Sequence, residues 1–169
     1  MSIWLNLAKV PENLLRKIIA RPDLLEALFF EVDSDTPDDR PEIVGAVSSR
    51  DILGCDYRTV NAVADALARE AGAGDDWRTN LPWLAQAVGA DPAHPINDYR
   101  FTYGPAFFIQ AHEVAAIRDG LIAEGWSFPE TVRDEPDPDA DYIYEDFVDL
   151  VPFYEAAARE GKAIVGGVS

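Results

Sequence analysis

The stretch Tyr103–Leu121, YGPAFFIQAHEVAAIRDGL, places a short apolar run directly before an amphipathic helix pattern. Ala106–Ile109 has the length of a buried strand, and the pair Gly104-Pro105 before it is typical of a break in regular structure. Apolar residues then recur at helical spacing, at Val114, Ile117, Leu121 and Ile122. We therefore predict a strand that is followed at once by a helix, which ends near Gly125.

Two further apolar segments near the ends of the sequence have strand character. Ile3–Leu7 alternates with a period of two, and Ala163–Val168 is short, apolar and rich in β-branched residues. Because the backbone groups of each segment need partners, we predict that both join Ala106–Ile109 in one mostly antiparallel sheet. Several helices would pack on this small sheet, which gives an α+β fold in a single domain over residues 1–169.

Helix signals occupy much of the chain between these strands. Apolar residues at helical spacing, together with residues typical of helix starts, predict helices after Pro11, after Pro22, from Asp56 to Gly72, and over Trp77–Val88. Pro82 lies inside the last of these patterns. Because proline is tolerated in a first helical turn, the start of that helix is predicted near Asn80.

Aromatic residues are unusually frequent for a chain of this size. Tyr99, Phe101 and Tyr103 alternate with polar residues and predict a strand or extended arm with an aromatic face. Packing in the core is the expected role of most large aromatics, while some are expected to line a cleft or an interaction patch: Trp4, Trp77, Trp83, Tyr99, Phe101, Tyr103, Phe107, Phe108 and Trp126.

One more helix is predicted in the C-terminal part of the chain. Its start is expected near Asp139 or Asp141 and its end at Gly161. Pro152 is expected to kink or split it, because proline removes one backbone hydrogen bond. Its apolar stripe consists of Ile143, Phe147, Leu150 and Tyr154.

The composition is strongly acidic. Fourteen Lys and Arg stand against thirty-one Asp and Glu, which gives a formal net charge of −17. Such a charge disfavours binding to nucleic acid or to an anionic membrane, favours solubility, and attracts basic partners. Much of it lies in two predicted loops, Glu31–Glu42 and Arg133–Asp139.

The chain contains one cysteine, Cys55, so no internal disulfide is expected, and we interpret this residue as a small buried apolar one. No run approaches the ~20 apolar residues of a membrane span, and the N-terminal residues lack the features of a signal peptide. The sequence therefore predicts a cytoplasmic protein.

Metal and catalytic motifs are incomplete. Asp137, Asp139 and Asp141 alternate like the carboxylates of a calcium loop, but the glycine and the glutamate that the motif needs are replaced by Tyr142 and Val148. His94 and His112 have no spacing that suits a zinc site, although His112 and Glu113 form a possible local acid–base pair. We therefore predict no metal site, no cofactor and no catalytic residue.

Three blocks in order resemble the YfbM-like family, a bacterial family of small proteins of unknown function. They are DWRTNLPWLAQAVG at Asp76–Gly89, the stretch Tyr103–Leu121, and FVDLVPFYEAAAREGKAIVGGV at Phe147–Val168. The segment RPDLLEALFFE is also similar, so the resemblance covers the chain outside Val32–Cys55. It departs at Gln110-Ala111-His112, where the family has Thr-Pro-Glu. The resemblance implies an α+β fold and supplies no catalytic residues.

Two functions follow from these observations. The first is a non-enzymatic interaction module, inhibitory or immunity-type, that binds a more basic partner through acidic residues at Asp137, Asp139, Asp141 and Glu145. The second is a small-ligand-binding protein or enzyme with a cleft near Trp77, Tyr103 and His112, where Gly104 and Pro105 let a ligand approach the backbone.

Overall fold

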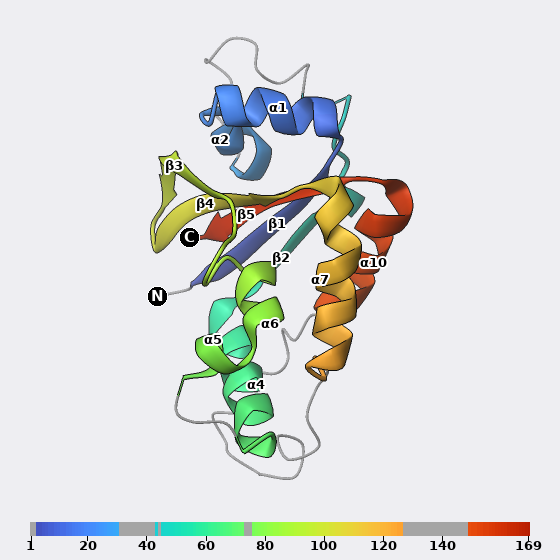
Figure 1. Ribbon diagram of the computed structural model, residues 1–169. Helices are drawn as coiled ribbons and strands as arrows, with labels where there is room; N and C mark the ends of the chain where they lie inside the picture. The colour runs from blue at the N-terminus through green and yellow to red at the C-terminus, as the bar shows by residue number, and fades with distance from the viewer. Residues whose placement is uncertain (1–2, 31–42, 44, 73–75, 127–148) are drawn as a thin grey trace.

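The computed structural model describes residues 3–30, 43, 45–72, 76–126 and 149–169. Within them, five strands form one sheet in the order β2-β1-β5-β4-β3, and every neighbouring pair is antiparallel (Figure 1). The strands are β1 (Trp4–Val10), β2 (Ile52–Asp56), β3 (Pro95–Phe101), β4 (Gly104–Ile109) and β5 (Ala163–Val168). The prediction that the first, the last and the central strand share one antiparallel sheet is confirmed, and β5 lies between β1 and β4.

Helices cover both faces of this sheet (Figure 1). One face, which we call the α1 face, carries α1 (Glu12–Ala20) and α2 (Leu24–Phe29). The other, the α7 face, carries α4 (Tyr57–Glu70), α5 (Trp77–Asn80), α6 (Pro82–Ala87), α7 (Ala111–Ala123) and α10 (Leu150–Glu160). A short 3-10 helix, η1 (Ser49–Asp51), precedes β2. The α+β fold class is therefore confirmed.

Side-chain alternation along the strands divides the core into two parts. In β1, Leu5 and Leu7 are buried on the α7 face, whereas Ala8 and Val10 are buried on the α1 face. By the same alternation Lys9 lies on the α7 face. Its side chain is only 6% exposed, which is unusual for a charged residue. A buried lysine of this kind must find opposite charges within the protein.

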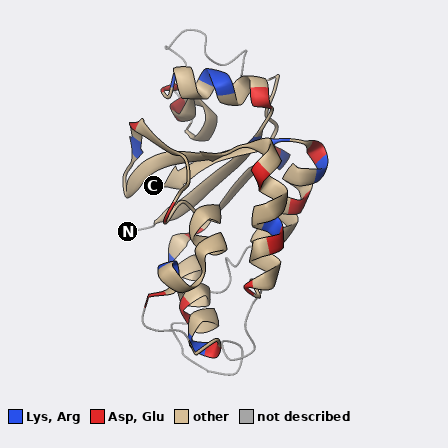
Figure 2. Cartoon of the chain, viewed as in Figure 1, with Lys and Arg blue, Asp and Glu red and all other residues tan. Residues whose placement is uncertain are grey.

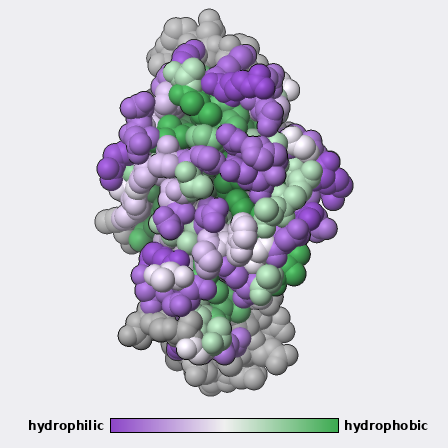
Figure 3. All heavy atoms as spheres, in the orientation of Figure 1, coloured by the Kyte–Doolittle hydropathy of each residue, from purple (hydrophilic) through white to green (hydrophobic). Residues whose placement is uncertain are grey.

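Surface composition follows from this layering. Charged residues lie mainly on the helices and turns, while the middle of the sheet is almost uncharged (Figure 2). Hydrophilic residues cover most of the face in Figure 3, with apolar residues in small patches between them. Cys55 is buried in the core of the α7 face, as expected.

Several helix boundaries confirm the sequence signals. The Asp56 side chain accepts a hydrogen bond from the Arg58 backbone N–H and caps α4. α1 and α2 begin just after Pro11 and Pro22. Gly125 follows α7 with φ +75°. The helices were predictable because their signals are local.

Two predictions near the centre of the chain were wrong. The helix expected over Trp77–Val88 is two short helices, because Leu81 leaves the helical region (φ −122°, ψ 69°) just before Pro82. Gly104 and Pro105 begin β4 instead of breaking the chain, and the turn falls two residues earlier, on Thr102 and Tyr103.

The exposed end of α7 and the start of α10 also differ from expectation. Ile122 is 57% exposed, because it lies outside the buried stripe formed by the other apolar residues of α7. α10 begins at Leu150, where the Asp149 carboxylate accepts a hydrogen bond from the Val151 backbone N–H. Pro152 therefore falls in a first turn, where its missing N–H breaks no bond within the helix.

Two sets of predictions are not tested by these elements. The residues Ile143 and Phe147 lie outside the described part of the chain, as do the two predicted acidic loops. β2 was not predicted at all. Its burial pattern is exposed, intermediate, exposed, buried and buried, so it has no regular alternation for a sequence reading to detect.

Candidate functional site

A pocket of about 350 Å³ lies on the α7 face, at the end of the sheet where β1 begins and β5 ends. In Figure 1 the segments that surround it meet between the label for the C-terminus and helices α5 and α6. Its wall contains residues from α4, α5, the segment after α6, the β3–β4 turn and β5. They are Ile3, Tyr57, Asn61, Arg78, Val88, Gly89, Ala90, Tyr103, Gly104, Pro105, Gly167 and Val168.

The polar part of this wall comes from two helices. Tyr57 and Asn61 lie one turn apart in the first half of α4, and Arg78 lies in α5. The Trp77 ring, only 2% exposed, donates a hydrogen bond from Nε1 to Oδ1 of Asn61 at 3.2 Å. The buried tryptophan thereby links the two helices and fixes the position of the asparagine.

Arg78 is held at the edge of the pocket by its neighbours in sequence. Its guanidinium carbon lies 4.9 Å from the centre of the Trp77 ring, within the range of a cation–π contact. Its backbone N–H donates to the Asp76 side chain at 3.0 Å, so this aspartate caps α5. The three consecutive residues therefore supply a cap, a core anchor and a cationic group.

Tyr57 is the neighbour of Arg78 across the polar wall. Burial raises the pKa of the Tyr57 hydroxyl above its ordinary value of 10, while the nearby positive charge of Arg78 only partly opposes this shift. The hydroxyl is therefore protonated at neutral pH and has a proton that it can donate.

Glycine backbone also lines the pocket. Gly89 has φ +73°, and a Cβ atom there would lie 2.4 Å from the Phe107 ring. At Gly167, a Cβ atom would lie 2.0 Å from Phe101. Larger residues would displace these core rings, so the close approach of backbone and aromatic packing depends on glycine at both positions.

The β3–β4 turn completes the rim. The backbone N–H of Tyr103 donates to the Val168 carbonyl at 3.0 Å, which fixes the turn against the end of β5. The Tyr103 side chain is 45% exposed, while Gly104 and Pro105 line the pocket beside it. An aromatic ring at the mouth of a pocket can contact both a ligand and water.

The structure brings together most of the residues expected near a cleft. Tyr103, Gly104 and Pro105 line the pocket, and Trp77 supports it from behind through its hydrogen bond to Asn61. His112 does not line it and is exposed at the start of α7. The residues Asp137, Asp139, Asp141 and Glu145 lie outside the described part of the chain.

The polar residues of the pocket were not among the residues singled out from the sequence: Tyr57, Asn61 and Arg78. A partial signal was present, because Arg78 directly follows a tryptophan and a helix-capping aspartate. Tyr57 and Asn61 had no such signal, since a tyrosine and an asparagine one turn apart are common on exposed helices.

A second polar contact involves the other histidine. Nε2 of His94 lies 2.9 and 3.0 Å from the two carboxylate oxygens of Glu113, and its ring stacks on Phe108. Burial raises the pKa of Glu113, but hydrogen bonds from His94 and the Gln110 backbone outweigh it and lower the pKa overall. The histidine that contacts the Glu113 carboxylate is thus His94 instead of His112.

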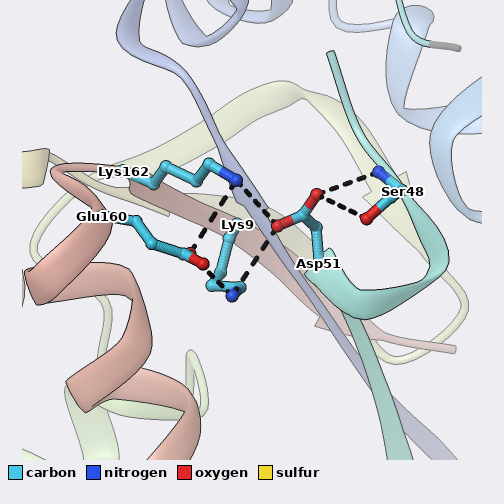
Figure 4. A network of polar contacts seen from close by, with 5 residues as sticks. All are labelled: Lys9, Ser48, Asp51, Glu160 and Lys162. Atoms are coloured by element: carbon cyan, nitrogen blue, oxygen red, sulfur yellow. Dashed lines mark hydrogen bonds and ion pairs between the residues drawn. The ribbon is translucent and has the colours of Figure 1, made fainter. Parts of the chain in front are cut away.

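Charged residues also gather at the other end of the β1–β5 pair (Figure 4). Nζ of Lys9 lies 2.7 Å from Glu160 and 3.7 Å from Asp51, and Nζ of Lys162 lies 2.9 Å from Asp51. Asp51 also accepts hydrogen bonds from the backbone N–H and the hydroxyl of Ser48. We call these five residues the charged cluster.

Each charge in this cluster faces an opposite one. Burial raises the pKa of Asp51, but hydrogen bonds from Ser48 and Lys162 lower it further than burial raises it. The hydrogen bond from Lys9 lowers the pKa of Glu160, and the hydrogen bond to Asp51 raises the pKa of Lys162. The cluster therefore satisfies its own charges and joins β1, η1, α10 and the start of β5.

Within the described residues, no three His, Cys, Asp or Glu side chains are grouped so as to hold a metal ion. In the same part of the chain, no helix has both the length and the apolarity needed to cross a membrane. Comparison of the chain with protein-family models, curated proteins and solved structures found no match. The resemblance to the YfbM-like family therefore stays a prediction.

Proposed function

We propose that this protein binds a small molecule in the pocket between α4, α5 and the end of β5. The observation that carries this proposal is that the pocket combines a few polar side chains with an apolar lining. Its polar side chains belong to Tyr57, Asn61 and Arg78, and its apolar side chains belong to Ile3, Val88, Ala90, Pro105 and Val168. Sites for small ligands combine an apolar lining with a few convergent polar groups in this way.

The size and the chemistry of the pocket support binding. Its volume of about 350 Å³ falls at the lower end of the range of ~300–1,000 Å³ that small-molecule sites occupy. The described lining residues present no carboxylate, imidazole or thiol, the groups that most often transfer protons or attack substrates. The side chains that do line the pocket suit recognition of a ligand better than its chemical conversion.

The other function expected from the sequence, binding of a basic partner through acidic residues, stays a prediction. The residues that would carry it, Asp137, Asp139, Asp141 and Glu145, are not described by the structure. The pocket, in contrast, has twelve lining residues in the described part of the chain, and three of them, Tyr103, Gly104 and Pro105, were singled out from the sequence.

Protein-observed NMR with a panel of small aromatic and aliphatic acids, amides and alcohols tests the proposal. We expect some members to shift the backbone amide resonances of Gly89, Gly104 and Gly167 at millimolar concentration. Val168→Phe adds a ring at the apolar wall and should weaken these shifts. Ile122→Phe makes the same kind of change at an exposed position of α7 and should leave them unchanged.

Two results would overturn the proposal. The first is a panel in which no compound shifts the three glycine resonances. The second is shifts of equal size in the wild type and in Val168→Phe, because binding would then lie outside the pocket. An otherwise native amide spectrum of Val168→Phe shows that the variant is folded.

A further inference from the structure

We infer that the pocket selects a ligand with an apolar body and one terminal carboxylate, which Arg78, Tyr57 and Asn61 bind together. This inference rests on the proposed small-molecule function and adds the chemical class of the ligand. It follows from the hydrogen-bonding capacity that each of the three side chains has left.

The orientation of the Asn61 amide is fixed by its neighbour. An indole N–H can only donate a hydrogen bond, so the contact from Trp77 Nε1 requires the amide oxygen of Asn61 at that position. The group that Asn61 can still offer a ligand is therefore its NH₂, which donates. The contact with the buried tryptophan therefore uses the acceptor of the amide and leaves its donor for a ligand.

Tyr57 and Arg78 are also donors toward a ligand. The guanidinium of Arg78 has only N–H groups, so it can only donate hydrogen bonds. Burial raises the pKa of Tyr57, so its hydroxyl keeps its proton at neutral pH and can donate it to an acceptor in the pocket. The polar wall therefore presents donors from all three side chains, which suits a group that only accepts hydrogen bonds, as a carboxylate does.

The charge of the pocket also favours a ligand with a carboxylate group. Arg78 carries the one formal charge among the described lining residues, in a chain whose net charge is −17. Its nearest carboxylate contact in the described chain, Asp76 Oδ1, lies 3.7 Å from Nη1, which is longer than a hydrogen bond. The two side chains are 47% and 59% exposed, so water weakens this pair and a ligand can compete with it.

A single cation in an acidic protein favours a monoanion over a phosphate, which carries more negative charge. The apolar side chains that line the pocket add contact area for a hydrocarbon or aromatic body. The stacking of the guanidinium on Trp77 limits its freedom before binding, so less conformational entropy is lost when a ligand arrives.

Matched probe pairs test the inference on the full chain. We would titrate 3-phenylpropanoate against 3-phenylpropanamide and indole-3-acetate against indole-3-acetamide, and follow the Gly89 and Gly104 amide resonances. Phenyl phosphate serves as the phosphate probe. Charge-assisted hydrogen bonds to Arg78 should make each acid bind roughly tenfold more tightly than its amide, with phenyl phosphate weaker than the acids.

Variants assign the preference to particular groups. Arg78→Gln should remove the difference between acid and amide, and Arg78→Lys should keep part of it. Arg16→Gln removes a cation from an exposed site on α1 and should change nothing. Asn61→Asp keeps an acceptor for Trp77 but replaces the donating NH₂ by a carboxylate oxygen, so it should reject the acids and still bind the amides.

The outcomes separate the two proposals. Equal binding of acids and amides in the pocket overturns the carboxylate inference and leaves the small-molecule function standing. Preference for phenyl phosphate also overturns it. Acid binding that survives both Arg78→Gln and Asn61→Asp shows that other groups hold the carboxylate. Absence of any shift at the pocket overturns the proposed function, and the inference falls with it.

Discussion

The charged cluster and the ligand pocket lie at opposite ends of the β1–β5 strand pair. Polar groups are buried and paired in the cluster, whereas in the pocket they face an open volume. Ile3 lines the pocket and Lys9 belongs to the cluster, so six residues of extended chain, or about 20 Å, separate them. In the cluster, Lys9 and Asp51 are almost fully buried and face opposite charges. In the pocket, Arg78 is about half exposed beside an open volume.

This difference indicates what each region does. Burial of a charge is costly unless partners within the protein satisfy it, so a closed cluster contributes to the folded state and leaves nothing for a ligand. Donors that face an open pocket are hydrated in the free protein and can exchange water for a ligand. We therefore expect mutations in the cluster to change stability, and mutations in the pocket to change binding.

The largest effect is expected from Asp51→Ala. This change leaves the Lys9 and Lys162 ammonium groups with Glu160 alone and removes the acceptor for Ser48, so the free energy of unfolding should fall by about 3 kcal/mol. Urea unfolding measures the change.

Asp119→Ala is the matched control, because Asp119 pairs with Arg118 on the surface and is 67% exposed. Its loss should stay below about 0.5 kcal/mol. Equal effects of the two substitutions would show that burial of the charged cluster adds nothing to stability.

The contribution of Asp51 should depend on pH. Its pKa in the folded protein is lower than the ordinary 3.8, so its stabilising effect is present above about pH 4 and is lost as the pH falls through the folded pKa. We expect the stability difference between the wild type and Asp51→Asn to narrow below pH 4. A gap of constant size between pH 7 and pH 3 would contradict the pKa direction.

A smaller effect is expected from Asn61→Ala, at the border between structure and binding. It leaves the buried Nε1 of Trp77 without its acceptor, at a cost of about 1–2 kcal/mol. Asn13→Ala is an exposed helical control that makes the same change of side chain on α1. If both variants lose the same free energy of unfolding, water replaces the lost acceptor, and the packing of Trp77 does not depend on its hydrogen bond to Asn61.

The smallest effect on stability is expected from Arg78→Gln. The side chain is 47% exposed and its contact with Asp76 is 3.7 Å long, so the free energy of unfolding should change by less than about 1 kcal/mol. Urea unfolding beside Asp51→Ala makes the comparison direct. A loss as large as that of Asp51→Ala would place Arg78 among the structural residues and remove the contrast between the two regions.

The sequence by itself determined the local elements of this protein. Periodicity and capping residues, which act over a few residues, predict strands over Ile3–Leu7, Ala106–Ile109 and Ala163–Val168 and helices after Pro11, Pro22 and Asp56. The structure has strands and helices at each of these places. The sequence also predicted a break in the chain near Tyr103, because the aromatic alternation ends there beside a glycine and a proline. The turn itself lies two residues before the position predicted for that break.

Only the tertiary structure decided which polar residues meet. Arg78 approaches Tyr57 because Trp77, buried between α4 and α5, donates to Asn61, a contact across sixteen residues of sequence. Lys9 could be placed on the same side of β1 as Leu5 and Leu7, but the charges that satisfy it belong to η1 and α10. Alternation gives the side of a strand, whereas the partners there depend on how distant segments pack.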